Sequence, residues 1–474
     1  MRANGRKGVR NCPIPTFCKL LSYSGCKTMF SAFVAFLGSS LGIISLFLLF
    51  ALTVVSYFKS RWVLLAYVAT WGFIPLMAGR DVIGPVDVDD LLLLYVSVLT
   101  FVPAILQSTT FGRLGKFAIT YWILSLCSNT LSLLLHDDIT GFVLRQMMKD
   151  FAILLFLLTV DLNLRDLQFT RRFFFALVIS GAGALLNTLA GYLLPEASFF
   201  LFQPQKIAAS EGIRRFAGTL EESYLAGSMM LGSFGFLLAL FLSKSKSLIR
   251  LFALGGLLLH VWGIAAGQSR CTFVGVAVIT TCFFLKLRQA LYGGLFLLLV
   301  IAFLYSLPDL NQRILGRIQT TDPTLSGRVS LWLHYVSNAP AAVWLIGEGY
   351  TRMTFRDTAG HSSYLEVLSD TGLLGLILFS SLWYHVLTAP KRIQASMGTD
   401  FEKVLALSAV WVSLGLLISS GGVGLIVESA YRLVFMSWMG VSMAQAWERP
   451  SMFFDTRLHT NLIQYHSSGA KLNR

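Results

Sequence analysis

Long apolar segments, separated by short polar turns, dominate the pattern of this chain. Most are roughly 16 to 24 residues long, the length that a helix needs to cross about 30 Å of hydrocarbon. Each is therefore predicted to form a membrane-spanning helix. The segments are 62–78, 90–107, 117–135, 149–163, 173–194, 223–243, 251–266, 272–285, 290–307, 363–387, 403–419 and 425–447.

A further apolar run, 29–57, is too long for one ordinary span. Glycine and serine residues at its centre (38–42) favour a tight hairpin of two short spans, and one long tilted helix is the alternative. The fold class predicted from the pattern is all-α. We expect a polytopic membrane bundle of about 12–14 transmembrane helices, with a folded helical loop region on the outer face.

Composition supports the same class. Of the 474 residues, 55% are hydrophobic and only 13% are charged, whereas a soluble domain carries about 25% charged residues. The chain therefore has too little polar surface for an ordinary soluble protein.

The net charge of +14 does not indicate a nucleic-acid partner, because the basic residues lie mostly in short turns between apolar segments. They occupy alternate turns, as in membrane proteins whose cytoplasmic loops are basic. Both termini are predicted on that cytoplasmic side. The basic turns contain Lys59 and Arg61, Arg113 and Lys116, Arg165 with Arg171 and Arg172, Lys244 with Lys246 and Arg250, Lys286 and Arg288, and Lys391 with Arg392.

This alternation gives the domain organisation. The two longest connections between spans, 195–222 and 308–362, fall on the outer face, and connections of that length are usually functional or disordered. The predicted parts are a basic cytoplasmic tail (1–28, or a start site set too early), a transmembrane bundle (29–307, with outer loop 195–222), a large periplasmic loop (308–362), C-terminal transmembrane helices (363–447) and a cytoplasmic tail (448–474).

The outer face should be poor in basic residues, yet it contains many arginines. They are Arg145, Arg214, Arg215, Arg313, Arg317, Arg328, Arg352 and Arg356, with Arg270 at the mouth of a helix hairpin. A guanidinium group matches phosphate oxygens two at a time. Each arginine could instead pair with a nearby acid, but the set as a whole favours an anionic substrate. His361, where the large loop re-enters the membrane, suits general-base work, with a surface histidine as the alternative.

Four motifs on this face resemble the bacterial O-antigen ligase and polymerase superfamily. The first is H-S-S-Y-L-E-V-L-S-D-T-G-L-L-G-L-I-L-F at 361–379. The others are S-G-R-V-S-L-W (326–332) with G-E-G-Y (347–350), R-R-F-A-G-T-L-E-E-S-Y-L-A-G (214–227) and G-Q-S-R (267–270). Ser223, Ser362 and Asp370 stand where the family often has asparagine, asparagine and glutamate, which leaves sugar and acceptor specificity open.

The resemblance implies a metal-independent membrane glycosyltransferase of the bacterial inner membrane, with no cofactor. The donor would be a polyprenyl-diphosphate-linked glycan, and the acceptor another lipid-linked carrier or glycan. His361, Arg270 and Arg215 would be catalytic, in a basic cavity that Arg328 also lines. Arg214, Arg328, Trp332, Tyr364 and Arg145 would contact substrate.

Three alternatives stay open. Carboxylates at Asp87, Asp89 and Asp90 and at 136–138 could bind a divalent metal instead. The chain could be a flippase or transporter of the same lipid-linked glycan, or a structural scaffold.

Glu428 and Arg432, one turn apart in the last span, are predicted to pair with each other, with cavity lining as the alternative.

Overall fold

The computed structural model describes residues 59–73, 81–83, 86–107, 110–135, 140–193, 223–243, 246–267, 269–286, 290–305, 337, 341–349, 362–395, 400–422 and 429–448. The predicted hairpin 29–57, the outer loop 195–222, most of the loop 308–362 and nearly all of both tails lie outside these residues.

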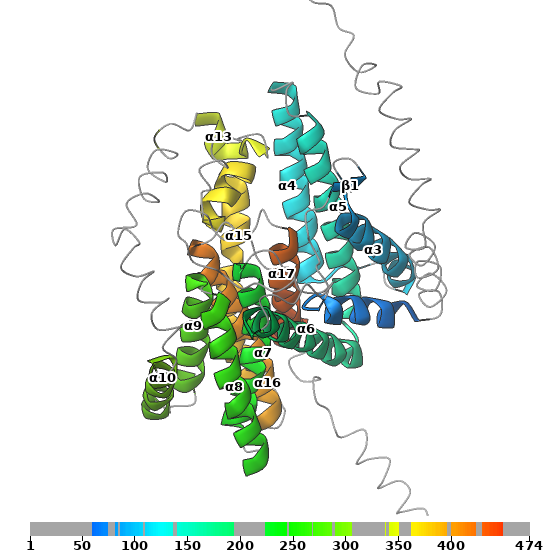
Figure 1. The fold of residues 1–474 in the computed structure, drawn as a ribbon. Helices are drawn as coiled ribbons and strands as arrows, with labels where there is room; N and C mark the ends of the chain where they lie inside the picture. The colour runs from blue at the N-terminus through cyan, green and yellow to red at the C-terminus, as the bar shows by residue number, and fades with distance from the viewer. Residues whose placement is uncertain are drawn as a thin grey trace, which may run out of the picture.

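The described chain is a helix bundle (Figure 1). After a helix over 59–70 come α3 (Val88–Gln107), α4 (Arg113–Leu135), α5 (Thr140–Asn163), α6 (Leu167–Leu193), α7 (Ser223–Leu242), α8 (Ser247–Gly267), α9 (Arg270–Lys286), α10 (Ala290–Tyr305), α13 (Ala341–Ile346), α15 (Ser363–Ala395), α16 (Asp400–Ser419), the 3-10 turn η3 (Ser420–Gly422), α17 (Ser429–Met443) and the π-helical turn η4 (Ala444–Glu448). A small hairpin of β1 (Asp81–Ile83) and β2 (Val86–Asp87) precedes α3.

Six of the described helices are long and apolar enough to cross a membrane: α4, α6, α7, α8, α15 and α16. The predicted all-α, multi-pass membrane fold is therefore confirmed. Helices suit this environment because they satisfy their backbone hydrogen bonds internally, where lipid offers no partners.

Helix α16 lies at the centre and contacts α7, α9, α15 and α17. Close approach depends on small residues, as is usual for helices packed in lipid. A Cβ built on Gly232 of α7 would lie 2.4 Å from the Trp438 ring of α17. One built on Gly235 would lie 2.4 Å from Val412 of α16. Larger residues at these positions would push the central helices apart.

Helix α15 corrects the predicted span 363–387, because the chain reverses inside it. Gly372 has φ 68° and ψ −165°, a conformation open essentially to glycine alone. The Trp383 indole N–H donates to the Tyr364 hydroxyl at 2.9 Å, although 19 residues of continuous helix would place them about 28 Å apart. Residues 363–371 therefore form a short helix that folds back on the longer one, 373–395.

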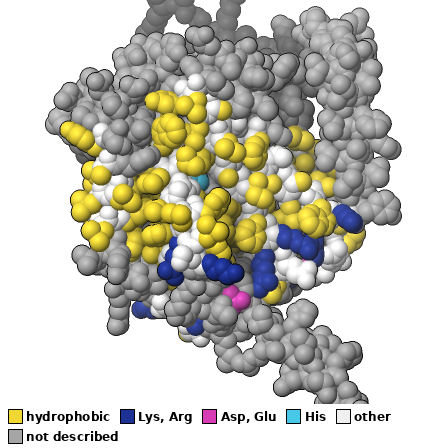
Figure 2. All heavy atoms as spheres, turned by 60° about the horizontal axis from the view of Figure 1, so that its bottom comes forward, with side chains coloured by type: hydrophobic (Ala, Val, Ile, Leu, Met, Phe, Trp, Pro, Cys, Tyr) yellow, Lys and Arg dark blue, Asp and Glu magenta, His cyan; other side chains and the backbone are white. Residues whose placement is uncertain are grey.

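Three of the basic turns that the sequence predicts on one side lie together, those at 59–61, 110–116 and 165–172. Arg61 pairs with Asp166, Arg165 donates to the Thr110 hydroxyl at 2.7 Å, and the Arg172 guanidinium lies 4.7 Å from the Trp62 ring centroid. Figure 2 shows basic side chains gathered along one edge of a largely hydrophobic face. The compartment that this edge faces stays a prediction.

Candidate functional site

Two of the four sequence motifs interlock where α13 meets the reversal in α15. Gly347 and Gly372 both have positive φ, and a Cβ on either would lie 2.5 Å from the backbone of the opposite segment. The Glu348 N–H donates to the Ser369 carbonyl at 2.8 Å. The glycines of the G-E-G and S-D-T-G sequences are thus required because backbone packs directly against backbone at this contact.

Helix α4 supports this contact from the side. The Ser128 hydroxyl donates to the Asp370 carbonyl at 2.5 Å. A Cβ on Gly349, which also has positive φ, would lie 2.6 Å from the Asn129 side-chain oxygen. Ser128 and Asn129 are both buried, so the motif segments are fixed to the bundle rather than only to each other.

The first motif also reaches the end of α16, where the last residue of the 214–227 motif and the residues that follow G-Q-S-R lie. The Tyr364 hydroxyl, in the first turn of α15, donates to the Leu417 carbonyl at 3.0 Å. Two residues further on, the Ser419 hydroxyl donates to the carbonyl of Cys271, the second residue of α9, at 2.8 Å. The first turns of α9 and α7 also touch, because a Cβ on Gly227 would lie 2.1 Å from the Thr272 hydroxyl. Segments of α7, α9 and α15 that lie far apart in sequence therefore surround one end of α16.

The predicted site residues divide into three groups. Tyr364 is described in full and is half-buried at this convergence. Arg270 is the first residue of α9, and Arg145 lies in the second turn of α5, each described by its backbone only. His361, Arg215, Arg214, Arg328 and Trp332 lie outside the described residues, as do 136–138 of the metal alternative, and Asp87 is described by its backbone only. The basic cavity predicted around them stays a prediction.

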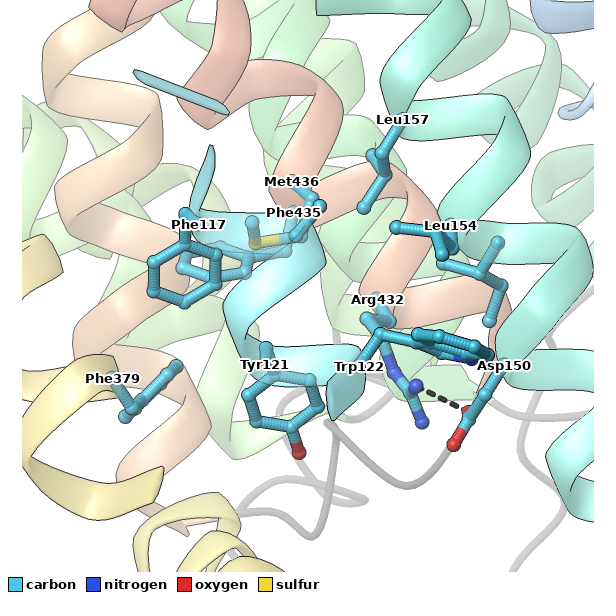
Figure 3. Close-up of a pocket in the computed structure, with 12 residues that line it drawn as sticks. Phe117, Tyr121, Trp122, Asp150, Leu154, Leu157, Phe379, Arg432, Phe435 and Met436 are labelled. Atoms are coloured by element: carbon cyan, nitrogen blue, oxygen red, sulfur yellow. Dashed lines mark hydrogen bonds and ion pairs between the residues drawn. The ribbon is translucent and has the colours of Figure 1, made fainter. Parts of the chain in front are cut away.

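A second polar feature lies inside the bundle (Figure 3). The sequence pattern singles out Arg432, with cavity lining as one interpretation, but not its partner Asp150. Arg432 of α17 donates to Asp150 of α5 at 2.5 Å, and their side chains are only 7% and 5% exposed. The Ser125 hydroxyl of α4 donates to the other carboxylate oxygen at 3.1 Å. The predicted partner of Arg432, Glu428, lies outside the described residues, so that pairing stays untested.

Two cavities adjoin this ion pair. One of about 40 Å³ is lined by Arg432, Tyr121 and several apolar residues, and the other, of about 400 Å³, by Ser125, Asn129 and mostly apolar residues. Trp122 and Asp150 line both. The signal that could have found this site is a lone acid at the start of an apolar segment, since ionisable groups within spans are costly and usually functional.

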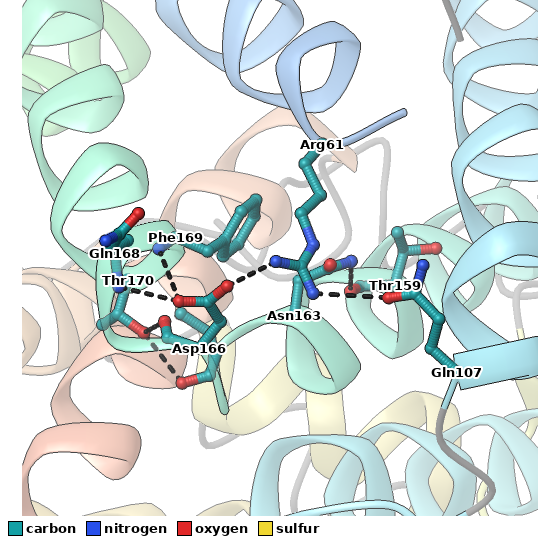
Figure 4. A network of polar contacts seen from close by, with 9 residues as sticks. Arg61, Gln107, Thr159, Asn163, Asp166, Gln168, Phe169 and Thr170 are labelled. Atoms are coloured by element: carbon teal, nitrogen blue, oxygen red, sulfur yellow. Dashed lines mark hydrogen bonds and ion pairs between the residues drawn. The ribbon is translucent and has the colours of Figure 1, made fainter. Parts of the chain in front are cut away.

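A third polar network links the basic turns at the opposite end from α13 (Figure 4). Burial of the Asp166 carboxylate would raise its pKa, but hydrogen bonds from the backbone N–H groups of Gln168 and Phe169, with the charge of Arg61, lower the pKa below its ordinary value. Asp166 also begins α6, because its Oδ1 accepts the Gln168 N–H at 2.8 Å. This network explains how the chain turns from α5 into α6 and is held to the helix over 59–70.

No family model matches the chain, and no curated protein is similar enough to count as a match. The functional argument therefore rests on the motifs and on the geometry given above.

Proposed function

We propose that this protein is a metal-independent membrane glycosyltransferase. It transfers a glycan from a polyprenyl-diphosphate carrier to an acceptor hydroxyl at the periplasmic face of a bacterial inner membrane. One observation supports the proposal: parts of three motifs, and the residues that directly follow the fourth, pack together although up to about 150 residues separate them. The G-E-G segment packs on the reversal in α15, and the first turns of α7, α9 and α15 pack around the end of α16.

Contacts of neighbouring residues support the choice of Arg270 and His361 as catalytic residues. Arg270 directly precedes Cys271, whose carbonyl accepts a hydrogen bond from Ser419. His361 lies three residues before Tyr364, whose hydroxyl donates to Leu417. Tyr364 and Cys271, which lie close in sequence to His361 and Arg270, are therefore hydrogen-bonded to the same short stretch of α16. A shared site for donor and acceptor requires such proximity.

The proposed reaction breaks the bond between the sugar anomeric carbon and the diphosphate oxygen. The bonding electrons leave with the lipid diphosphate, and Arg270 and Arg215 stabilise the added negative charge, an effect worth several kcal/mol when cations are prearranged. The acceptor oxygen forms the new bond to the anomeric carbon. Its proton passes to His361, the general base.

The test is glycan transfer by purified protein in nanodiscs, with a lipid-diphosphate glycan as donor. His361→Ala should slow transfer by roughly 10²–10⁴-fold while donor binding is kept. Arg270→Ala should weaken donor binding and slow transfer. Arg270→Lys should restore these two properties only partly, because an ammonium group cannot make the two-pronged contact with phosphate oxygens. Arg250→Ala, at the basic end of α8, is the control and should transfer normally.

Two results would overturn this proposal. Near-normal transfer by both His361→Ala and Arg270→Ala would remove the assigned site. Loss of transfer with a chelator, restored by added divalent metal, would move the chemistry to the carboxylates around Asp87. Offering a second donor unit and a lipid A-core acceptor in parallel distinguishes a polymerase from a ligase.

The buried ion pair of Arg432 and Asp150 favours a second candidate, a transporter of the same lipid-linked glycan, because charges inside a bundle often mark a transport path. Liposomes with a fluorescent lipid-linked glycan in the outer leaflet and no acceptor discriminate the two. Movement of the glycan to the inner leaflet supports transport, whereas no movement together with transfer to an added acceptor supports the enzyme.

A further inference from the structure

The larger cavity beside Asp150 lies between α3, α4 and α5 and measures about 400 Å³. Leu94, Leu144, Met148 and Phe151 contribute to its apolar wall. Three of these side chains are also exposed at the surface of the bundle: Leu144 by 48%, Met148 by 50% and Phe151 by 42%. The cavity therefore opens at an apolar part of the bundle surface, where an occupant can enter.

Water is a poor occupant for this space. Each buried water needs two to four polar partners. Among the described residues, the wall offers the polar side chains of Ser125, Asn129 and Asp150 and the indole N–H of Trp122, and the rest is apolar. A hydrocarbon chain, which needs no such partners, matches the rest of the lining.

The polar side chains are gathered at one place and form a single network. The Asn129 amide donates to the Ser125 hydroxyl at 3.1 Å, and Ser125 donates to Asp150 at 3.1 Å. The charge of the carboxylate is balanced by Arg432. A charge-neutral network of donors and acceptors complements an uncharged hydroxyl-bearing group better than an ionised one.

We propose that this cavity binds a neutral amphiphile from the bilayer: one hydrocarbon chain lies in the apolar part, and an uncharged, hydroxyl-bearing head group meets Asp150, Ser125 and Asn129. The cavity adjoins the G-E-G segment, because Asn129 in its wall also lies against Gly349, but the proposal does not rest on the proposed function.

The test uses a monoacylglycerol with a photoreactive diazirine in its chain, incorporated in nanodiscs with the full-length protein. Crosslinks mapped by mass spectrometry should concentrate on cavity residues such as Leu126 and Met148. Leu126→Trp, which fills the cavity, should reduce them at least five-fold, and Leu126→Phe provides a milder filling variant if the first does not fold. Ile123→Trp is the matched control, because Ile123 lies on the same helix but faces outward and is 48% exposed.

The head group is tested separately. Ser125→Ala should reduce crosslinking of the monoacylglycerol about five-fold, the scale of one lost hydrogen bond. A fatty acid or lysophosphatidylglycerol with the same photoreactive chain should crosslink less than the monoacylglycerol in the unchanged protein. Stronger crosslinking of either anionic probe would overturn the proposed class of ligand.

Labelling spread evenly over lipid-facing residues, and unaffected by both filling variants, would overturn the site itself. So would a disulfide trap that places residues 29–57 of the chain in the cavity. In that case the occupant would be a segment of the protein and not a lipid.

Discussion

The ion pair between Arg432 and Asp150 provides the sharpest test of the fold. Both side chains are at least nine-tenths buried, and their contact joins α17 to α5 across 282 residues of sequence. Arg432→Met removes the cation but keeps much of the side-chain volume. It leaves a buried carboxylate without its counter-charge, which costs about 3–5 kcal/mol.

The double variant is the decisive comparison. Replacing Asp150 with leucine as well removes the uncompensated charge, and a buried ion pair can often be exchanged for apolar residues at little cost. The Arg432→Met, Asp150→Leu protein should therefore recover most of the lost stability. A coupling free energy of about 2–3 kcal/mol between the two sites is expected, at the upper end of the range for residues in contact.

Reversible unfolding by SDS in mixed micelles, followed by circular dichroism, measures these free energies. Arg61→Met is the control, because Arg61 also forms an ion pair, but one that is partly exposed at the bundle end; partly exposed pairs contribute about 1 kcal/mol or less. Equal destabilisation by Arg432→Met and Arg61→Met would refute this reasoning. So would a double variant whose loss of stability equals the sum of the losses caused by Arg432→Met alone and Asp150→Leu alone.

Three further predictions follow from particular residues. Gly372→Ala should destabilise the protein by about 1–3 kcal/mol because of its backbone conformation, whereas Gly255→Ala, with open space around it, should be neutral or stabilising in the same unfolding assay. Asp166→Asn should be less stable than the unchanged protein above about pH 4, and this difference should vanish as the pH falls through the lowered pKa of Asp166, as measured by unfolding across pH 2–7. Cysteines at Ser326, but not at Ser245, should react with an impermeant thiol reagent added from the periplasmic side, and the reverse pattern would invert the topology.

The apolar pattern of the sequence predicted most of the helices. The predicted segment 223–243 became α7, Ser223–Leu242, and 403–419 became α16, Asp400–Ser419. These predictions succeed because a span in lipid needs a minimum apolar length and satisfies its own backbone, so its position can be read without knowing its neighbours. The alternation of basic turns likewise anticipated that the turns at Arg61 and Asp166 share one end of the bundle.

The motifs were also visible in the sequence, but their contacts were not. The glycines at 347, 349 and 372 stood out as parts of a pattern, and only the structure shows why glycine is needed there, since a Cβ at each would meet backbone or a buried side chain. The reversal at Gly372 escaped prediction although the run S-D-T-G at 369–372 interrupts the apolar pattern there, because the overall apolar length of the segment 363–387 predicts a single span.

The sequence by itself determined which parts of this chain enter the membrane, because hydrophobic length is a property of each segment alone. The tertiary structure decided which polar groups meet inside. Asp150, Ser125 and Arg432 belong to three helices, and whether they face one another depends on how each helix is rotated about its axis. That rotation is set by packing against neighbouring helices and not by the span's own composition. The buried ion pair and its two cavities are therefore products of the assembled bundle.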